Sequence, residues 1–172
     1  MDYFEKSEIG QILLAAPAKH RLWMLIGFYH GLRISEILSL TPRNFVFGKL
    51  TIGRGKGSRG TTQTLLKHSN PLLDESAQIA GVLGTLDAST RLFPWTRQHA
   101  WRIFKTACFK ARLTEHGHPH LLKHSCGMAM IQSGATLLET QARLGHKRVS
   151  STAVYLHASD KSADVAAKKA FA

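Results

Sequence analysis

The helical pattern of this chain is interrupted once, by a short block rich in β-branched residues, and that interruption limits the possible folds. Before the block, apolar residues recur at helical spacing over residues 8–16, 21–29 and 34–40. Pro42 ends the pattern, because proline cannot continue a helical hydrogen-bond ladder. The block itself holds three segments typical of β-strands, residues 45–47, 50–52 and 61–66. We therefore predict one small three-stranded antiparallel sheet inside a helical protein.

Helical spacing returns after Pro71 and continues through the rest of the chain. The expected helices cover residues 72–83, 98–113, 121–133, 137–144 and 151–156. With 172 residues, the chain is long enough for one domain with a sizeable core and too short for two ordinary domains. We predict a single α+β domain, residues 1–172, that is mostly α-helical.

The chain carries an excess of basic residues. There are 23 Lys and Arg residues against 11 Asp and Glu residues, so the formal net charge at pH 7 is +12. Such a charge indicates a polyanionic partner, and nucleic acid is the first candidate. A membrane partner is disfavoured, because the sequence has no signal peptide and no apolar run of about 18 residues. We expect a cytoplasmic, nucleoid-associated protein.

Two segments place cations where an anion could bind. Arg33 stands between apolar neighbours, so it should either pair with Glu36 or reach into an anion site. The loop of residues 53–60 combines four glycines with three cations, Arg54, Lys56 and Arg59. A mobile hairpin tip of this kind suits contact with a phosphate backbone, and a merely solvated basic turn is the alternative. The spacing of the loop does not fit a Walker A nucleotide site.

Histidines are dense in residues 116–124, but a metal site is not the favoured interpretation. No pair of cysteines and no acidic ligands stand nearby, and His120 and His124 alone cannot complete a coordination sphere. His120 and Lys123 are three residues apart, so they share one face of the expected helix. We therefore predict no metal here.

A fourth segment, residues 144–155, ends one helix at Gly145 and delivers Tyr155 from the next. Taken alone, Tyr155 is typical of a core aromatic. In their order along the chain, however, the four segments resemble the catalytic domain of the tyrosine recombinases, the phage integrase family. The matching motifs are the G-L-R-I-S-E box, the G-K-G lysine, H-x-x-R with Lys in the last place, and L-G-H. His146 follows His120 by 26 positions and Tyr155 follows His146 by nine, as in bacterial members of the family.

The resemblance implies a role for each matching residue. Tyr155 would attack the scissile phosphate, while Arg33, Lys123 and His146 would hold its oxygens. Lys56 would protonate the leaving 5'-oxygen, and His120 would help to move the tyrosine proton. The remaining expected contacts are Arg43, Arg54, Arg59, Lys147 and Arg148 for DNA, with Glu36 and His124 as structural support. The resemblance implies no metal and no other cofactor.

One position departs from the family pattern, because Lys123 stands where the family has its second arginine. A planar fork that could grip two phosphate oxygens is thereby replaced by a single charge. Such a loss is worth about 1.5–3 kcal/mol, or roughly ten- to a hundredfold in rate. Two other functions therefore stay open: a catalytically weak or inactive DNA-binding relative, and relaxation of DNA like a type IB topoisomerase.

The resemblance also has implications for subfamily and assembly. Residues 118–127 look especially like the single-domain invertases that switch fimbrial genes and that lack an N-terminal core-binding domain. Double-stranded DNA is the expected partner, with a homo-oligomer on DNA, a tetramer in the synapse, and an accessory DNA-bending protein as further partners. We expect the tail, residues 159–172, to be exchanged between protomers, with a frayed terminus as the alternative.

Overall fold

The computed structural model of the chain describes residues 3–55, 58–113 and 117–155. Its helices are α1 (Lys6–Ala15), α2 (Ala18–His30), α3 (Ile34–Ile37), α4 (Glu75–Leu83), α5 (Arg97–Lys110), α6 (His120–Gln132), α7 (Leu137–Leu144) and α8 (Ser150–Ala153). A short 3-10 helix, η1 (Pro42–Asn44), precedes the strands β1 (Phe45–Val46), β2 (Lys49–Ile52) and β3 (Thr61–Thr64). The prediction of a mostly helical protein with one small sheet is confirmed.

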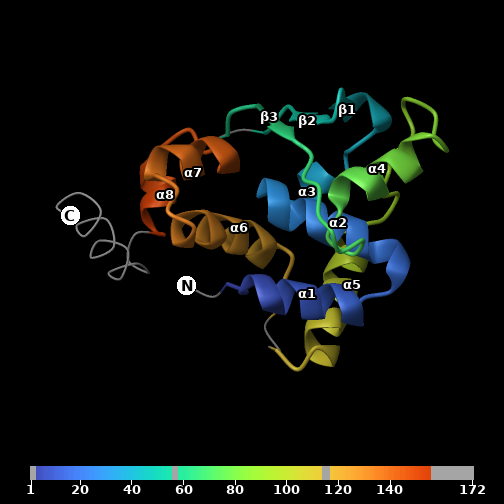
Figure 1. Cartoon of the computed structure of the whole chain (residues 1–172), viewed down its shortest axis with the longest axis horizontal. Coiled ribbons are helices and arrows are strands. Elements are labelled where there is room, and N and C mark those ends of the chain that lie inside the picture. The colour runs from blue at the N-terminus through green and yellow to red at the C-terminus, as the bar shows by residue number, and fades with distance from the viewer. Residues whose placement is uncertain (1–2, 56–57, 114–116, 156–172) are drawn as a thin grey trace.

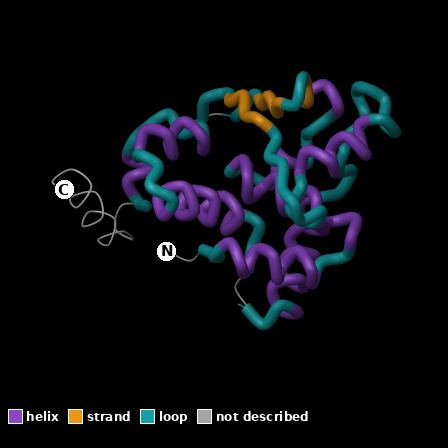
Figure 2. The backbone as a smooth tube through the Cα atoms, viewed as in Figure 1, coloured by secondary structure: helices purple, strands orange, loops and turns teal. Residues whose placement is uncertain are grey.

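The sheet has the order β1-β2-β3, and both pairs of neighbours are antiparallel. Leu50 of β2 pairs with Phe45 on one side and with Gln63 on the other. Side chains alternate along β2, so that Leu50 and Ile52 are buried and the residues between them are exposed. The sheet therefore covers the helices with one face, and it lies along one edge of the molecule (Figures 1 and 2).

Helix α2 forms the centre of the core. Trp23, Met24, Leu25 and Ile26 are all fully buried, which requires packing on every side of the helix. Its neighbours include α1, α4 and α6 (Figure 1). A smaller apolar cluster surrounds Tyr155 and joins α6 to the end of α7. This second cluster is the part of the core that lies next to the candidate site.

Two glycines end the helices that lead into that site. Gly31 follows α2 with φ +58, and Gly145 follows α7 with φ +65, both in the left-handed region that favours glycine. A Cβ at Gly31 would lie 2.4 Å from a Leu144 methyl carbon, so the two chain turns pack directly against each other. The turns that carry the first and fourth sequence motifs are therefore neighbours.

Some predicted boundaries differ from the structure. The helix predicted from residue 72 begins at Glu75, because the Asp74 carboxylate accepts a hydrogen bond from Ala77 N at 2.9 Å and caps the helix there. The predicted strand 61–66 ends at Thr64. Lys56 and the tail predicted for exchange, residues 159–172, lie outside the described residues.

Candidate active site

Arg33 is the N-cap residue of α3, and its guanidinium is held from two sides. Nη1 donates to Glu36 Oε1 at 3.2 Å and to Ser58 Oγ at 2.8 Å, while Glu36 Oε2 accepts from the Arg33 backbone N–H at 2.8 Å. The side chain is nevertheless 37% exposed. Arg33 therefore pairs with Glu36 and still faces solvent, so the ion pair does not prevent it from reaching an anion.

Arg54 occupies a different place from the one predicted. Its side chain is fully buried, with Nη1 3.8 Å from Glu36 Oε2. Nη1 donates to the carbonyls of Gly31 and Leu144, and Nη2 donates to those of His30 and Arg143. The prediction that Arg54 contacts DNA is wrong for this arrangement, because a guanidinium enclosed by carbonyls cannot reach a phosphate.

The flanks of the 53–60 loop are docked against the turn after α7. Arg59 N donates to Gly145 O at 2.8 Å, and Ser58 forms an antiparallel bridge with His146. Ser58 is buried, whereas the Arg59 side chain is exposed. The loop is thus anchored by Ser58 and Arg59 on one side and by the buried Arg54 side chain on the other. Lys56 and Gly57 between them lie outside the described residues.

Lys123 lies on α6 and is only 2% exposed. Its Nζ donates to Gly31 O at 3.0 Å and to Leu144 O at 2.8 Å, the same two carbonyls that accept from Arg54 Nη1. The pKa of Lys123 is lowered to about 7, mainly by burial and also by the charges of Arg54 and Arg33. In the free protein this ammonium therefore joins the two turns and is only weakly held in its charged form.

His146 follows the left-handed Gly145 and is also buried. Its Nδ1 lies 3.0 Å from Thr152 Oγ1 of α8, which fixes the ring orientation. Burial lowers the pKa of His146 to about 4, and the cations Lys123, Arg33 and Arg54 act in the same direction. The imidazole is therefore neutral at neutral pH and lies within electrostatic reach of all three cations.

His120, the first residue of α6, is exposed, and its ring centroid is 4.7 Å from that of His124. Burial of part of the ring lowers the pKa of His120, and the charge of Lys123 adds to this. His120 is thus a neutral, accessible base beside the buried cations. The predicted site residues Arg33, His120, Lys123 and His146 are all brought together, although they come from the start of α3, from α6 and from the turn after α7.

Tyr155 is withdrawn into the smaller apolar cluster in the free protein. Only 1% of the residue is exposed, and its hydroxyl hydrogen-bonds to His124 Nδ1 at 3.2 Å. The ring lies over Gly127, where a Cβ would be 2.7 Å from Tyr155 Cζ. Burial raises the pKa of Tyr155 to about 12. The core-aromatic interpretation of Tyr155 therefore describes this state, in which His124 holds the tyrosine hydroxyl.

The other residues predicted to contact DNA are exposed. Arg43 lies in η1, Arg59 at the end of the docked loop, and Lys147 and Arg148 in the turn before α8. Arg59, Lys147 and Arg148 flank the Gly145–His146 turn, whereas Arg43 is separated from it in the chain by the whole sheet.

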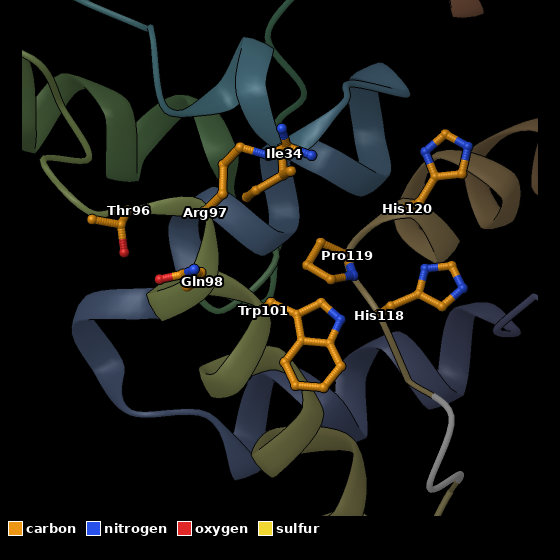
Figure 3. Close-up of a pocket in the computed structure, with 8 residues that line it drawn as sticks. All are labelled: Ile34, Thr96, Arg97, Gln98, Trp101, His118, Pro119 and His120. Atoms are coloured by element: carbon orange, nitrogen blue, oxygen red, sulfur yellow. The ribbon is translucent and has the colours of Figure 1, made fainter.

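A cavity of about 740 Å³ lies beside His120 and was not predicted. It is lined by Ile34 of α3, the segment 118–120 and the first turns of α5 (Figure 3). Arg97, Gln98 and Trp101 are its exposed polar and aromatic side chains. Part of this cavity could have been predicted, because Thr96 is a typical N-cap residue that places Arg97 and Gln98 in the first turn of a helix. No local sequence pattern, however, indicates that this turn lies next to His120.

The sequence profile of the Phage integrase family matches residues 2–162 of the chain. The chain belongs to this family. Among integrase relatives, the type 1 fimbriae regulatory protein FimE of Escherichia coli K12 is 28% identical over 149 residues, which cover 82% of this chain and 75% of FimE. A tyrosine recombinase of Thermosipho africanus is 27% identical over 98% of this chain and 61% of its own length. The resemblance to tyrosine recombinases, fimbrial-switch proteins included, is confirmed.

Solved integrase-family structures share the fold. The XerA recombinase superposes with a TM-score of 0.76 at 18% identity, covering 100% of this chain and 66% of XerA. The catalytic domain of bacteriophage HP1 integrase gives a TM-score of 0.69 at 21% identity, covering 98% of this chain and 94% of that domain. The predicted tyrosine recombinase catalytic-domain fold is therefore confirmed, and the chain spans part of the length of several longer relatives.

No helix in the described residues is long and apolar enough to cross a membrane. Within the same residues, no group of three or more His, Cys, Asp or Glu side chains is arranged to hold a metal ion.

Proposed function

We propose that the chain is the catalytic domain of a site-specific recombinase that breaks and rejoins double-stranded DNA through Tyr155. The observation that carries this proposal is the meeting of Arg33, His120, Lys123 and His146 from two helices and a turn. Arg33 and His146 would hold the oxygens of one phosphodiester, and His120 is an accessible base beside them. Lys123 would add its charge from behind the two carbonyls that it binds, and would contact the phosphate only if one of these bonds is given up. Family membership supports site-specific recombination as the process.

In the proposed reaction, the Tyr155 oxygen attacks phosphorus and the bond to the 5'-oxygen breaks. The products are a 3'-phosphotyrosine and a free 5'-hydroxyl. His120 would accept the tyrosine proton, and Lys56 would supply the proton to the departing oxygen. Attack by another 5'-hydroxyl reverses these steps. Because the phosphodiester energy is kept in the covalent bond, we expect rejoining to require neither ATP nor a metal.

The withdrawn position of Tyr155 adds a requirement to this mechanism. A phosphate in solution cannot meet a hydroxyl that is buried and bonded to His124. Tyr155 must therefore leave its place over Gly127 before attack, and it then loses the apolar contacts that bury it. We expect DNA binding to favour the released state, since only there can the hydroxyl meet the bound phosphate.

The cavity beside His120 supports a DNA-binding surface next to the reacting phosphate. Arg97 and Gln98 have donors that suit phosphate oxygens and base edges, and both are exposed. Arg43, Arg59, Lys147 and Arg148 would extend the contact along the backbone. These side chains are exposed, so DNA can reach them without a rearrangement of the core.

Assembly of the active complex belongs to the same proposal. Joining two sites needs several protomers, so we propose a homo-oligomer on DNA, a tetramer in the synapse, with the tail of residues 159–172 exchanged between protomers. An accessory DNA-bending protein and a cytoplasmic, nucleoid-associated location fit such a reaction. Residues 1–172 would act as a single catalytic domain.

The test is a search for a covalent protein-DNA adduct. Nicked duplexes tiled from the genomic neighbourhood of the gene would be incubated with the protein in EDTA, and adducts resistant to SDS would be counted. Tyr155→Phe is the matched control, because it removes only the hydroxyl. We expect an adduct with the unaltered protein at one site and none with Tyr155→Phe.

The competing functions predict other results. DNA binding with no adduct on any duplex would contradict the proposal and favour a non-catalytic relative. Lys123, in place of the second family arginine, is the sequence feature that favours this alternative. An adduct accompanied by relaxation of arbitrary plasmids, with no preference for a site, would favour a type IB topoisomerase-like activity.

A further inference from the structure

The C-termini of α2 and α7 converge on one guanidinium. Arg54 donates to His30 O at 3.0 Å and Gly31 O at 3.2 Å from α2, and to Leu144 O at 2.6 Å and Arg143 O at 3.2 Å from α7. Its Nε also faces Thr61 Oγ1 of β3 at 3.3 Å. All three guanidinium nitrogens are therefore bound to parts of the protein.

This arrangement explains how a fully buried arginine is tolerated. The last carbonyls of a helix carry partial negative charge, so two helix C-termini together form a site for a cation. Glu36 adds a full negative charge at 3.8 Å. A lysine at position 54 would keep the charge but offers one nitrogen with three donors, and so it could not hold both pairs of carbonyls at once.

The carbonyls held by Arg54 stand directly before the proposed phosphate-binding residues. Gly31 is two residues before Arg33, and Leu144 is two residues before His146. Lys123 donates to the same Gly31 and Leu144 carbonyls, so any change in the distance between the two turns also moves Lys123. Gly145 lies so close that a Cβ there would be 2.6 Å from Arg54 Cδ.

We propose that Arg54 is a positioning residue that sets the distance between the Arg33 turn and the His146 turn, and so fixes the phosphate-binding site. It does not touch the substrate. This inference rests on the proposed function, because it gives Arg54 an effect only through groups that hold the reacting phosphate.

The experiment compares two substrates that differ in charge. One is the nicked phosphodiester duplex, and the other carries a methylphosphonate at the scissile position, where a methyl group replaces a charged oxygen. A neutral substrate develops less charge in the transition state, so it depends less on well-placed cations. Cleavage rate and DNA affinity would be measured for Arg54→Lys and Arg54→Met, below the melting temperature of each variant.

Arg21→Met is the matched control. Arg21 also donates to carbonyls at a helix end, Ala16 O at 3.1 Å and Leu14 O at 3.3 Å, but these belong to the end of α1, away from the site residues. Its loss removes arginine–carbonyl bonds without changing the spacing of the two turns. Any effect it has on cleavage should be the same for both substrates.

We expect Arg54→Lys to cleave the phosphodiester about ten- to a hundredfold more slowly, with DNA affinity nearly unchanged, as is usual for a small displacement of reacting groups. The defect should shrink about tenfold on the methylphosphonate. Equal defects on both substrates, or a rate equal to that of the unaltered protein, would overturn the inference. If the unaltered protein forms no adduct with either duplex, the proposed function itself fails.

Discussion

Lys123, which stands where the family has its second arginine, is buried next to Arg54. The two cations share the carbonyls of Gly31 and Leu144 and repel each other across them. Burial and this repulsion account for the lowered pKa of Lys123, about 7. A lysine with a pKa near 7 is only partly charged at neutral pH, and a bound phosphate would favour its protonated form. An arginine would stay charged, so lysine at this position makes the charge depend on pH.

Replacing Lys123 with Met should change how stability depends on pH. The pKa of Lys123 is lowered to about 7 in the folded chain, against the ordinary lysine value of 10.5 in the unfolded chain. Between these values the unfolded chain binds a proton that the folded chain has released. The free energy of unfolding should therefore rise with pH through this window in the unaltered protein, and this rise should be absent in Lys123→Met.

Urea unfolding at several pH values across that window measures the effect. Lys110→Met serves as the control, because Lys110 is exposed at the end of α5. Its stability curve should run parallel to that of the unaltered protein. Curves of the same slope for Lys123→Met and the unaltered protein would contradict a lowered pKa at Lys123.

At the scale of elements, the turn between α7 and α8 organises the site more than any helix does. It carries His146, accepts the docked loop through Gly145 O and the Ser58 bridge, and ends the helix whose last carbonyls bind Arg54 and Lys123. The left-handed backbone at Gly145 makes this possible, because it turns the chain back sharply while leaving room for the Arg54 side chain.

Gly145→Ala should therefore destabilise the protein more than Gly134→Ala. Both glycines have positive φ, +65 and +88, so alanine adds about 1–2 kcal/mol of backbone strain at either place. At Gly145 the new Cβ also collides with Arg54, whereas nothing lies within 4 Å of the position at Gly134. Urea unfolding would measure the stability difference, and the adduct assay should show slower cleavage for Gly145→Ala alone. Equal losses in the two variants would argue against close packing at this turn.

For the whole molecule, the net charge of +12 lies mainly on the surface. The acids Glu36 and Glu75 are buried, and so are the cations Arg54 and Lys123. These buried charges offset each other, so the exposed residues keep a strong excess of positive charge. Such a surface should bind DNA mainly through its phosphates, with an affinity that falls steeply as salt is added.

Replacing Arg59 with Gln should lower the salt dependence of DNA binding. Each lost phosphate contact reduces the slope of log affinity against log salt concentration by about one. Lys110→Gln is the control, because Lys110 stands at the far end of α5 from Arg97 and the cavity. Binding isotherms at several salt concentrations give the slopes, and an unchanged slope for Arg59→Gln would remove Arg59 from the DNA-binding surface.

The amino-acid sequence alone was enough to predict the order of the elements and to name most residues of the candidate site. Helical spacing and β-branched runs are local properties, so the three strands and the helices around them could be predicted to within a few residues. The spacing of the four motifs likewise named Arg33, His120, Lys123, His146 and Tyr155, because a family pattern survives in single positions even where overall identity is low.

Only the tertiary structure decided which cations are free to meet a phosphate. Arg54 and Arg59 look alike in the sequence of one basic loop, yet Arg54 is enclosed and Arg59 is exposed. The partners of Arg54 are main-chain carbonyls at two helix ends, and any residue type would supply them, so no sequence pattern marks them. The burial of Tyr155 and the cavity beside His120 could not be predicted for a similar reason. Both are formed by segments that are far apart in the sequence and come together only in the fold.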